Sequence, residues 1–297
     1  MKVLVVHSGN KRELSPYIKE QVDSLIQEGV NIEYFTITSK GIFGYLKCLP
    51  KYFKKVRSFN PDIIHAHSGL SGLFANFIRR KKVITTFHGS DVYLKRNRIL
   101  SRITYFLSAE NIFVSTTLKN KLNVHKALVI TCGVDTDFFY PTNKVRNANE
   151  ILFSGSFDDP AKNFQLAEKA VEIYNIETSS NLKLIELKNK SRKEVAELMN
   201  NVLFLLITSH YEGSSQVLKE AMACNCPVIG VRVGSLPELL KDGKGGVLFN
   251  GVQNEFIEAV ELIVSNDYSN GRPHIIENGL SLKDTALKIK SVYQKYI

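Results

Sequence analysis

The alternation of short β-rich runs with longer amphipathic stretches is the feature that most constrains how this chain can fold. In residues 1–130, apolar runs of strand length are separated by stretches whose apolar residues recur at helical spacing. The predicted strands of this part are 3–7, 31–37, 62–66, 83–87, 111–115 and 127–130. The predicted helices are 16–28, 43–59, 70–80, 98–108 and 118–124.

The alternation restarts after a polar stretch, residues 135–149, which we interpret as an interdomain linker. The predicted strands are then 151–154, 182–187, 202–207, 227–230 and 246–249, and the predicted helices are 162–174, 192–200, 215–223, 237–240 and 255–264. Strands that alternate with helices are joined by right-handed crossovers and are therefore parallel. We expect an α/β fold with two doubly wound, Rossmann-like domains, residues 1–143 and 144–280.

Ligands of such sheets bind at the carboxyl ends of the strands. Two doubly wound halves in tandem therefore predict a functional cleft between them. The 297 residues, of which 44% are hydrophobic, are enough for two modest cores.

Several classes of protein are disfavoured by what the sequence lacks. No apolar run approaches the roughly 20 residues that span a bilayer, and residues 1–7 are too short and too soon polar for a signal peptide. We therefore expect a cytoplasmic protein. The four scattered cysteines have no zinc-ligand spacing, so we interpret them as free thiols.

The positive charge is concentrated in one half of the chain. Residues 1–145 carry 22 Lys and Arg against 10 Asp and Glu, whereas the other residues carry 17 against 19. An excess confined to one half indicates an anionic partner for that half. No recognisable nucleic-acid module accompanies the charge, so we expect no nucleic acid.

The loop that follows the predicted strand 202–207 carries the most informative chemistry. It reads Ser209-His210-Tyr211-Glu212-Gly213-Ser214-Ser215 and opens a predicted helix. Gly213 lets a ligand approach the backbone, and Ser214 and Ser215 can cap the helix, whose N-terminal N–H groups suit a diphosphate. Glu212 and Glu220 can accept hydrogen bonds from sugar hydroxyls.

The pair Glu212/Glu220, eight residues apart and followed by Ala221-Met222-Ala223 and Pro227-Val228, resembles the E-x7-E signature of the retaining GT-B glycosyltransferases of family four. Further segments that resemble this family are PDIIHAH (61–67), TFHGSD (86–91), GVDTDF (133–138) and VGSLPE (233–238). Together they extend over most of the chain, although any one of them alone would be a weak signal.

This resemblance implies a GT-B fold and a nucleoside diphosphate sugar as donor. It places Glu212 on the donor-sugar hydroxyls and Glu220 on the nucleotide ribose, and Lys162 on the diphosphate. The predicted catalytic residues are Glu212, Lys162 and His88. The predicted donor-binding residues are Ser156, Gly213, Ser214, Ser215, Gln216 and Glu220, and the acceptor-side residues are Gly9 and Asp91.

The sequence departs from the family pattern at two places. Ser156 stands where the family has an arginine on the diphosphate, so one cation is missing there. This departure puts either full activity or the use of the usual donor in question. Ser8-Gly9-Asn10 has one glycine where the family often has a pair.

Plainer interpretations exist for each motif. The two glutamates alone would read as solvated helix charges, and His88 could be a core histidine at a strand end. Asp135-Thr136-Asp137 imitates a metal-binding DxD, but its position favours turn chemistry, and we expect no required metal or other cofactor. Residues 79–82, Arg-Arg-Lys-Lys, are expected at a helix C-terminus.

The implied reaction is transfer of a sugar to an acceptor hydroxyl with anomeric retention, by front-face attack assisted by the leaving phosphate, in cell-surface glycan or polysaccharide assembly. Closure of the two domains would exclude water. Alternatives are a sugar-nucleotide epimerase, a phosphorylase or polymer synthase, and a non-catalytic subunit that binds a sugar nucleotide.

Two further expectations concern the C-terminal segment and the basic residues of the first half. The segment 281–297 has helical apolar spacing and, as in the family, should cross back to the first domain. The basic, aromatic stretch 45–57, with a break or bend near Pro50, and Arg79–Lys82, Arg96, Arg98 and Arg102 suggest docking on anionic lipid at the inner face of the membrane, where a lipid-linked glycan would be the acceptor. A solvated basic face with no partner is the alternative.

Overall fold

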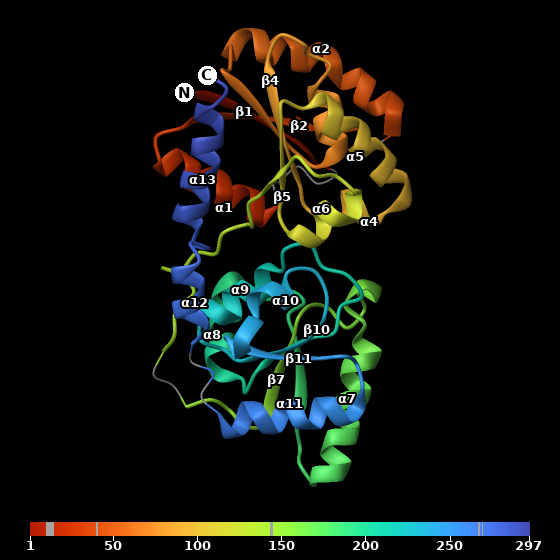
Figure 1. Cartoon of the computed structure of the whole chain (residues 1–297), viewed down its shortest axis with the longest axis vertical. Helices are drawn as coiled ribbons and strands as arrows, with labels where there is room; N and C mark the ends of the chain where they lie inside the picture. The colour runs from red at the N-terminus through yellow and green to blue at the C-terminus, as the bar shows by residue number, and fades with distance from the viewer. Residues whose placement is uncertain (10–14, 40, 143–144, 267, 269) are drawn as a thin grey trace. The chain divides into compact units, whose positions relative to one another are not determined.

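The computed structural model describes residues 1–9, 15–39, 41–142, 145–266, 268 and 270–297, which form two compact units (Figure 1). The first unit comprises Met1–Gly133 and Leu282–Ile297, and the second comprises Val134–Ser281. The predicted domain boundary, between residues 143 and 144, lies outside the described residues. The chain changes unit between Gly133 and Val134 instead.

The polar stretch 135–149 is not a free linker, because its described part packs on the second unit. The Arg146 guanidinium donates to the carbonyl of Met199 over 2.6 Å, and the ring of Phe139 is buried in the core of that unit. Composition indicated a linker because the stretch is polar, but Phe138 and Phe139 within it supply apolar surface that packs on the second unit.

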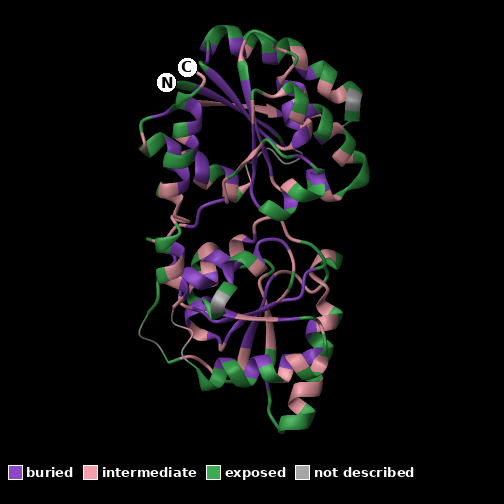
Figure 2. Ribbon diagram, in the orientation of Figure 1, coloured by how far each residue is buried: buried purple, intermediate pink, exposed green. Residues whose placement is uncertain are grey.

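The first unit contains a parallel sheet of six strands in the order β2-β1-β3-β4-β5-β6. The strands are β1 (Lys2–Ser8), β2 (Asn31–Ile37), β3 (Ile63–His67), β4 (Lys82–Phe87), β5 (Glu110–Phe113) and β6 (Leu128–Val129). The central strands are buried along their length (Figure 2), as expected for a parallel sheet covered by helices on both faces. The predicted α/β class is confirmed.

The helices of this unit are α1 (Pro16–Gln27), α2 (Gly41–Phe59), α3 (Gly69–Ala75), α4 (Ser90–Tyr93), α5 (Lys95–Leu107), α6 (Thr116–Leu122) and α13 (Leu282–Gln294). One expectation about them was wrong: α3 ends at Ala75, so residues 79–82 form a turn and the start of β4 rather than a helix C-terminus. Helix α2 continues through Pro50 without a break, and a bend at this residue stays a prediction. Helix α3 ends early because Asn76 caps it, with a side-chain hydrogen bond to the Gly72 carbonyl.

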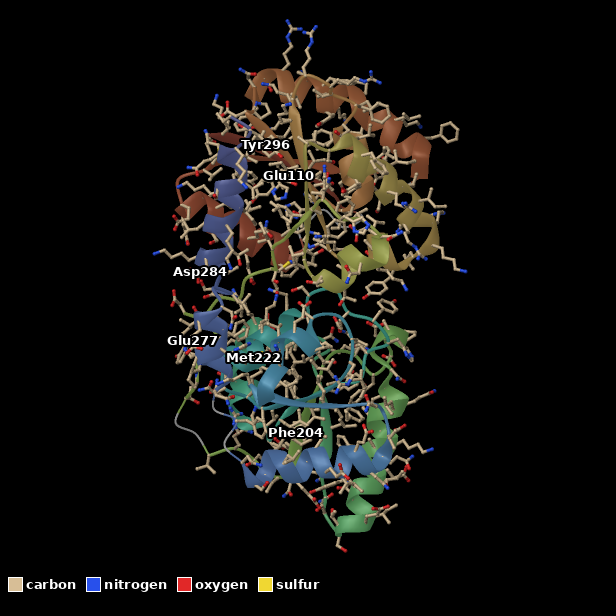
Figure 3. All side chains as sticks on the ribbon, in the orientation of Figure 1. Glu110, Phe204, Met222, Glu277, Asp284 and Tyr296 are labelled. Carbon is tan, nitrogen blue, oxygen red and sulfur yellow. The ribbon has the colours of Figure 1, made fainter. Side chains whose placement is uncertain are left out.

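The C-terminal helix α13 is part of the first unit. It packs along α1, with its apolar face in the same cluster as the core strands. The Ser24 hydroxyl donates to the Leu282 carbonyl over 3.0 Å, and the Tyr296 hydroxyl reaches the Glu110 carboxylate of β5 over 3.2 Å (Figure 3). The segment therefore returns to the fold that begins the chain.

The second unit contains a parallel sheet of five strands in the order β11-β10-β9-β7-β8. The strands are β7 (Glu150–Phe153), β8 (Lys183–Glu186), β9 (Leu205–Ile207), β10 (Val228–Val231) and β11 (Gly246–Phe249). The helices are η1 (Pro160–Lys162), α7 (Phe164–Thr178), α8 (Arg192–Asn201), α9 (Gln216–Ala223), α10 (Leu236–Leu239), η2 (Lys241–Gly243), α11 (Gln253–Ser265) and α12 (Gly271–Glu277).

Two apolar clusters pack on this sheet. One contains Met222 of α9 and the other contains Phe204 beside β9 (Figure 3). Ser191 begins α8 with a capping box in which its hydroxyl and the Glu194 side chain bind each other's backbone N–H groups. The two clusters make this unit doubly wound as well.

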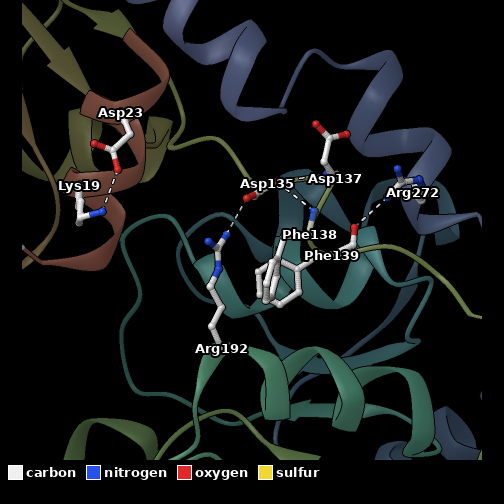
Figure 4. A network of polar contacts seen from close by, with 8 residues as sticks. All are labelled: Lys19, Asp23, Asp135, Asp137, Phe138, Phe139, Arg192 and Arg272. Atoms are coloured by element: carbon white, nitrogen blue, oxygen red, sulfur yellow. Dashed lines mark hydrogen bonds and ion pairs between the residues drawn. The ribbon is translucent and has the colours of Figure 1, made fainter. Parts of the chain in front are cut away.

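The Asp135-Thr136-Asp137 segment forms a turn (Figure 4). The Asp135 carboxylate accepts from the N–H groups of Asp137 (3.2 Å) and Phe138 (3.0 Å), and it pairs with Arg192 over 3.2 Å. The Arg192 guanidinium lies 4.4 Å from the centre of the Phe138 ring. Asp135 is thus engaged in local structure, in line with the turn interpretation.

None of the described helices combines the length and the apolar character needed to cross a membrane.

Candidate active site

The residues predicted to contact the donor meet on the second unit, where the segments after β7 and β9 lie together. Lys162, at the end of η1, places its Nζ 2.6 Å from Oε1 of Glu212. The Ser209 hydroxyl donates to the same oxygen over 2.9 Å. The Lys162 and Glu212 side chains are 21% and 12% exposed, so the pair is partly shielded from solvent yet open to a ligand.

Backbone contacts fix the two segments against each other. The Thr208 hydroxyl donates to the Lys162 carbonyl over 2.9 Å, and the N–H of His210 donates to the Ala161 carbonyl over 2.9 Å. Gly155 is needed for space, because a Cβ there would lie 2.8 Å from Cγ of Lys162. The Lys162 side chain therefore lies directly over the backbone that leaves β7.

Gly234 likewise leaves the space that Glu212 occupies. Its φ of +54° is in the left-handed region, and a Cβ there would lie 2.7 Å from both Cβ and the carbonyl oxygen of Glu212. The segment 233–238, which carried part of the family resemblance, is thus the wall behind the Glu212 loop.

The residues that follow Glu212 begin α9, although not with the predicted side-chain caps. Ser215 is at the N-cap position, but its hydroxyl makes no cap hydrogen bond and is buried without a partner among the described residues. Instead the N–H of Ser215 donates to the Ser235 hydroxyl over 3.4 Å. The Ser214 hydroxyl accepts from Lys219 over 2.8 Å, so it is held away from a capping geometry.

Gly213, Gln216 and Glu220 lie around the same turn, each half-buried. Gln216 begins α9 and Glu220 lies one turn further, so that the predicted donor-binding residues from 213 to 220 occupy the loop before α9 and the first part of that helix. Lys219, which the sequence reasoning overlooked, is fully buried. The sequence carried no signal for it, because lysine is almost never fully buried unless it is paired.

Ser156, in place of the expected arginine, occupies the turn after β7. Its hydroxyl accepts from the N–H of Asp158 over 3.2 Å, and its carbonyl accepts from the N–H of Asp159 over 3.1 Å. The side chain is half-buried and neutral. At this position the chain therefore offers a hydroxyl to a ligand but no cation.

The predicted residues Gly9, His88 and Asp91 lie on the first unit, at the carboxyl ends of β1 and β4. Gly9 is buried, and its N–H donates to the Ile37 carbonyl over 3.1 Å. The family pattern at Ser8-Gly9-Asn10 includes Asn10, which lies outside the described residues. His88 is half-buried after β4.

Asp91 is buried beneath the loop that carries His88. Its carboxylate accepts from the N–H groups of Gly89 (2.7 Å) and Gly69 (3.2 Å) as well as His88 (3.2 Å). Burial raises the pKa of the Asp91 carboxyl, and backbone hydrogen bonds, led by that of Gly89, oppose the rise. These contacts give Asp91 the role of holding the loop, which is more than the acceptor contact predicted for it.

A histidine network that sequence reasoning did not identify surrounds His88. Nδ1 of His67 lies 2.9 Å from Nε2 of His88, and the Cys132 sulfur lies 3.9 Å from Nδ1 of His88. Burial lowers the pKa of His67 well below its ordinary value, and the neighbouring histidines lower it further. The spacing His65-Ala66-His67 was the available signal, since alternate residues of a strand point to the same face.

Within the described part of the chain, no three or more His, Cys, Asp or Glu side chains are grouped so as to hold a metal ion.

Two family models match the chain. The model described as Glycosyltransferase Family 4 matches residues 3–138, and the model described as Glycosyl transferases group 1 matches residues 172–281. The first model matches mainly the first unit, and the second lies within the second unit.

Relatives that match most of the chain come from several organisms. An uncharacterized glycosyltransferase of Methanocaldococcus jannaschii is 29% identical over 276 residues, which cover 81% of this chain and 77% of the relative. The N-acetyl-alpha-D-glucosaminyl L-malate synthase of Bacillus anthracis is 23% identical, and the match covers 72% of this chain and 68% of the relative.

Solved structures share the fold. The sucrose-phosphate synthase of Thermosynechococcus elongatus superposes with a TM-score of 0.78 at 18% identity, covering 99% of this chain and 98% of the other. Anabaena HepE, solved in complex with UDP and glucose, gives a TM-score of 0.73 at 16% identity, covering 99% and 100%.

Proposed function

Because the chain belongs to the group 1, family-four glycosyltransferases of GT-B fold, we propose that it transfers a sugar from a nucleoside diphosphate sugar to an acceptor hydroxyl with retention of the anomeric configuration. Family membership gives the class of enzyme. The donor, the stereochemistry and the residue roles are our proposals.

The observation that carries the proposal is the Lys162–Glu212 pair beside the Gly213–Ser215 turn. A cation, a carboxylate and a helix N-terminus thus converge at the carboxyl ends of β7 and β9. A sugar diphosphate needs these three partners: a positive charge for the phosphates, backbone N–H groups for their oxygens, and an acceptor for sugar hydroxyls. HepE, which shares the fold and was solved in complex with UDP and glucose, supports the same donor class.

In the proposed reaction, the bond between the anomeric carbon and the phosphate oxygen breaks while the acceptor oxygen bonds to that carbon from the same face. The acceptor proton passes to the leaving phosphate. Lys162 and the N–H groups of residues 213–215 stabilise the charge that develops on the diphosphate. Glu212 holds the sugar hydroxyls, and Glu220 holds the ribose.

We also propose that the leaving group needs no metal ion. Lys162 supplies one positive charge, and Lys219 lies buried behind the same turn, where its Nζ binds the Ser214 hydroxyl. Two lysines at one loop provide the positive potential that a divalent cation supplies in other sugar-transfer sites. His88, on the first unit, is proposed to contact the reacting sugar.

The proposed acceptor is a glycan in cell-surface or polysaccharide assembly, free or lipid-linked. The lipopolysaccharide outer core galactosyltransferase WaaB shares the fold, with a TM-score of 0.75 at 16% identity. A galactosyltransferase of lipopolysaccharide with this fold supports the substrate class. An anionic membrane surface in contact with the first unit completes the proposal.

A non-catalytic protein that binds a sugar nucleotide is the second candidate, and Ser156 favours it. The position offers a hydroxyl in place of a guanidinium, and the Ser156 hydroxyl already accepts a turn hydrogen bond. Such a protein would bind the donor and leave it intact, so binding and turnover must be measured separately.

Donor binding is expected to raise the thermal midpoint of the purified chain. A ligand at 100 times its Kd adds about 2.7 kcal/mol to the stability of the state that binds it, and only one of the UDP, GDP and ADP sugar series should do so strongly. Glu220→Ala should abolish the shift, because the ribose loses its carboxylate. Glu261→Ala, an exposed carboxylate on α11, is the matched control and should leave it intact. If no member of the series shifts the midpoint, the donor site is refuted.

A further inference from the structure

Helix α5 of the first unit is packed with its polar side inward. Ser101 and Thr104 are its fully buried residues. The Thr104 hydroxyl donates to the Gly69 carbonyl over 2.7 Å, and the Ser101 hydroxyl donates to the Asp91 carbonyl over 2.8 Å. Helix α5 is therefore held against α3 by small hydroxyl side chains, and among its large residues Tyr105 packs against the core of the unit.

Two glycines of α3 make this contact close. A Cβ at Gly69 would lie 2.0 Å from the Ser101 oxygen, and one at Gly72 would lie 2.5 Å from the Thr104 methyl. The helices meet through small residues, which leaves no room between them for the large apolar side chains of α5.

Those large side chains point to solvent instead. The exposed fractions are 67% for Ile99, 45% for Ile103, 75% for Phe106 and 53% for Leu107. Their spacing of four, three and one residues places them on one face of the helix. Single exposed apolar residues are common, but a continuous apolar row on one helix face marks an interaction surface.

Cations accompany this row. Lys95, Arg96 and Arg102 are exposed and Arg98 is half-buried, and none of the four forms an ion pair with another described residue. The sequence has no acidic residue between Asp91 and Glu110. The outward side of α5 is thus apolar and cationic together.

Helix α2, the stretch from which the sequence first suggested membrane docking, has the ordinary orientation. Its apolar residues Tyr52, Val56 and Phe59 are buried in the core of the unit. Its outer side exposes Phe43, Leu46 and Phe53 beside lysines, but its inner side is apolar, unlike that of α5. The inverted pattern is therefore a property of α5 rather than of basic helices in this unit generally.

We propose that α5 docks on an anionic lipid bilayer. The helix lies parallel to the surface, with Ile99, Ile103 and Phe106 in the interfacial region and its Lys and Arg side chains among the anionic headgroups, which is the arrangement of interfacial amphipathic helices. An anionic bilayer fits this surface because its interface offers negative headgroups and an apolar layer side by side, which matches cations that flank an apolar row. The docking proposal rests on the proposed function in one respect: the proposed function supplies the lipid-linked acceptor that an enzyme docked on the bilayer would reach.

Vesicle co-sedimentation of the full chain tests the proposal. The chain should sediment with vesicles of phosphatidylcholine and phosphatidylglycerol, and remain in the supernatant with phosphatidylcholine alone. The triple variant Ile99→Ser, Ile103→Ser, Phe106→Ser should lower partitioning by about tenfold or more. Arg96→Gln with Arg102→Gln should weaken binding and flatten its dependence on salt.

The matched control removes exposed apolar side chains from the second unit. Ile176→Ser with Val264→Ser, both residues being as exposed as those of α5, should sediment like the unaltered chain. Equal recovery of the unaltered chain from both lipids, or equal binding by the triple variant, would overturn the proposal. A dimer that the triple variant abolishes, without vesicle binding, would assign the surface to self-association instead.

The nucleotide-sugar thermal shift, measured on the same samples, separates this inference from the proposed function. If an α5 variant loses vesicle binding but keeps the thermal shift caused by the nucleotide sugar, the result bears on the docking surface and leaves the donor site unaffected. An absent donor shift with vesicle binding intact would refute the donor site and leave the docking surface standing.

Discussion

Replacing Lys162 by alanine is expected to lower kcat by about 30- to 1000-fold, which corresponds to about 2–4 kcal/mol of transition-state stabilisation. The positive charge of Lys162 acts on the diphosphate as it leaves, so its loss is felt most in the transition state. In the free protein the same Nζ lies 2.6 Å from the Glu212 carboxylate, and the variant also leaves that carboxylate without its cation. Single-turnover measurement of donor consumption would report the loss.

A surface lysine provides the control for this variant. Lys188 pairs with Asp158 at an exposed position of the same unit, and exposed pairs contribute little to stability. Lys188→Ala should therefore leave kcat within about twofold. A Lys162→Ala enzyme with unchanged kcat would remove Lys162 from the mechanism, and a change confined to KM would make it a binding residue only.

The first unit is expected to lose stability as the pH falls below about 6.5. His65 is buried between Tyr293 and Thr86, and burial lowers its pKa to about 3, with a further contribution from His88. The unfolded chain titrates near pH 6.5, so between that pH and the folded pKa the unfolded chain binds a proton that the folded chain does not. The stabilisation is complete above pH 6.5 and is lost at about 1.4 kcal/mol per pH unit as the pH falls.

Denaturant unfolding between pH 7 and pH 5 measures this effect. The unaltered chain should lose about 2 kcal/mol from His65 alone over the lower part of that interval, and His65→Gln should flatten the profile even if it is less stable at pH 7. His125→Gln, at an exposed histidine, should keep the steep profile. Parallel profiles for the unaltered chain and His65→Gln would contradict the assignment.

The sequence was sufficient for the sheets but not for the segments between them. The bounds of β2 and β11, residues 31–37 and 246–249, match the predicted ranges, because Gly, Asn or Ser residues flank each strand-forming run. Helix α3 is shorter than its apolar pattern, since Asn76 ends it through a side-chain bond that periodicity does not contain. The stretch 135–149 misled because its packing depends on Phe138, Phe139 and a distant partner, Arg192.

In the candidate site, too, the residues close in sequence were predictable and the contacts between distant residues were not. The residues named from one loop, from Glu212 to Glu220, stay together because one turn and one helix carry them. Lys162 joins them through a contact between segments 50 residues apart, which the family resemblance supplied and spacing could not. The bond from Lys219 to Ser214 and the contact of His67 with His88 escaped notice because each depends on side-chain burial rather than on a motif.

The central claim is that the chain moves a sugar from a nucleoside diphosphate with retention. Proton NMR of the reaction, with the donor found by thermal shift and a hydroxyl acceptor, tests it most directly. We predict that the anomeric signal of the donor disappears while a product signal of the same anomeric configuration grows, and that Lys162→Ala slows both together. Product of the opposite configuration, or a donor that binds and is never consumed, would contradict the account.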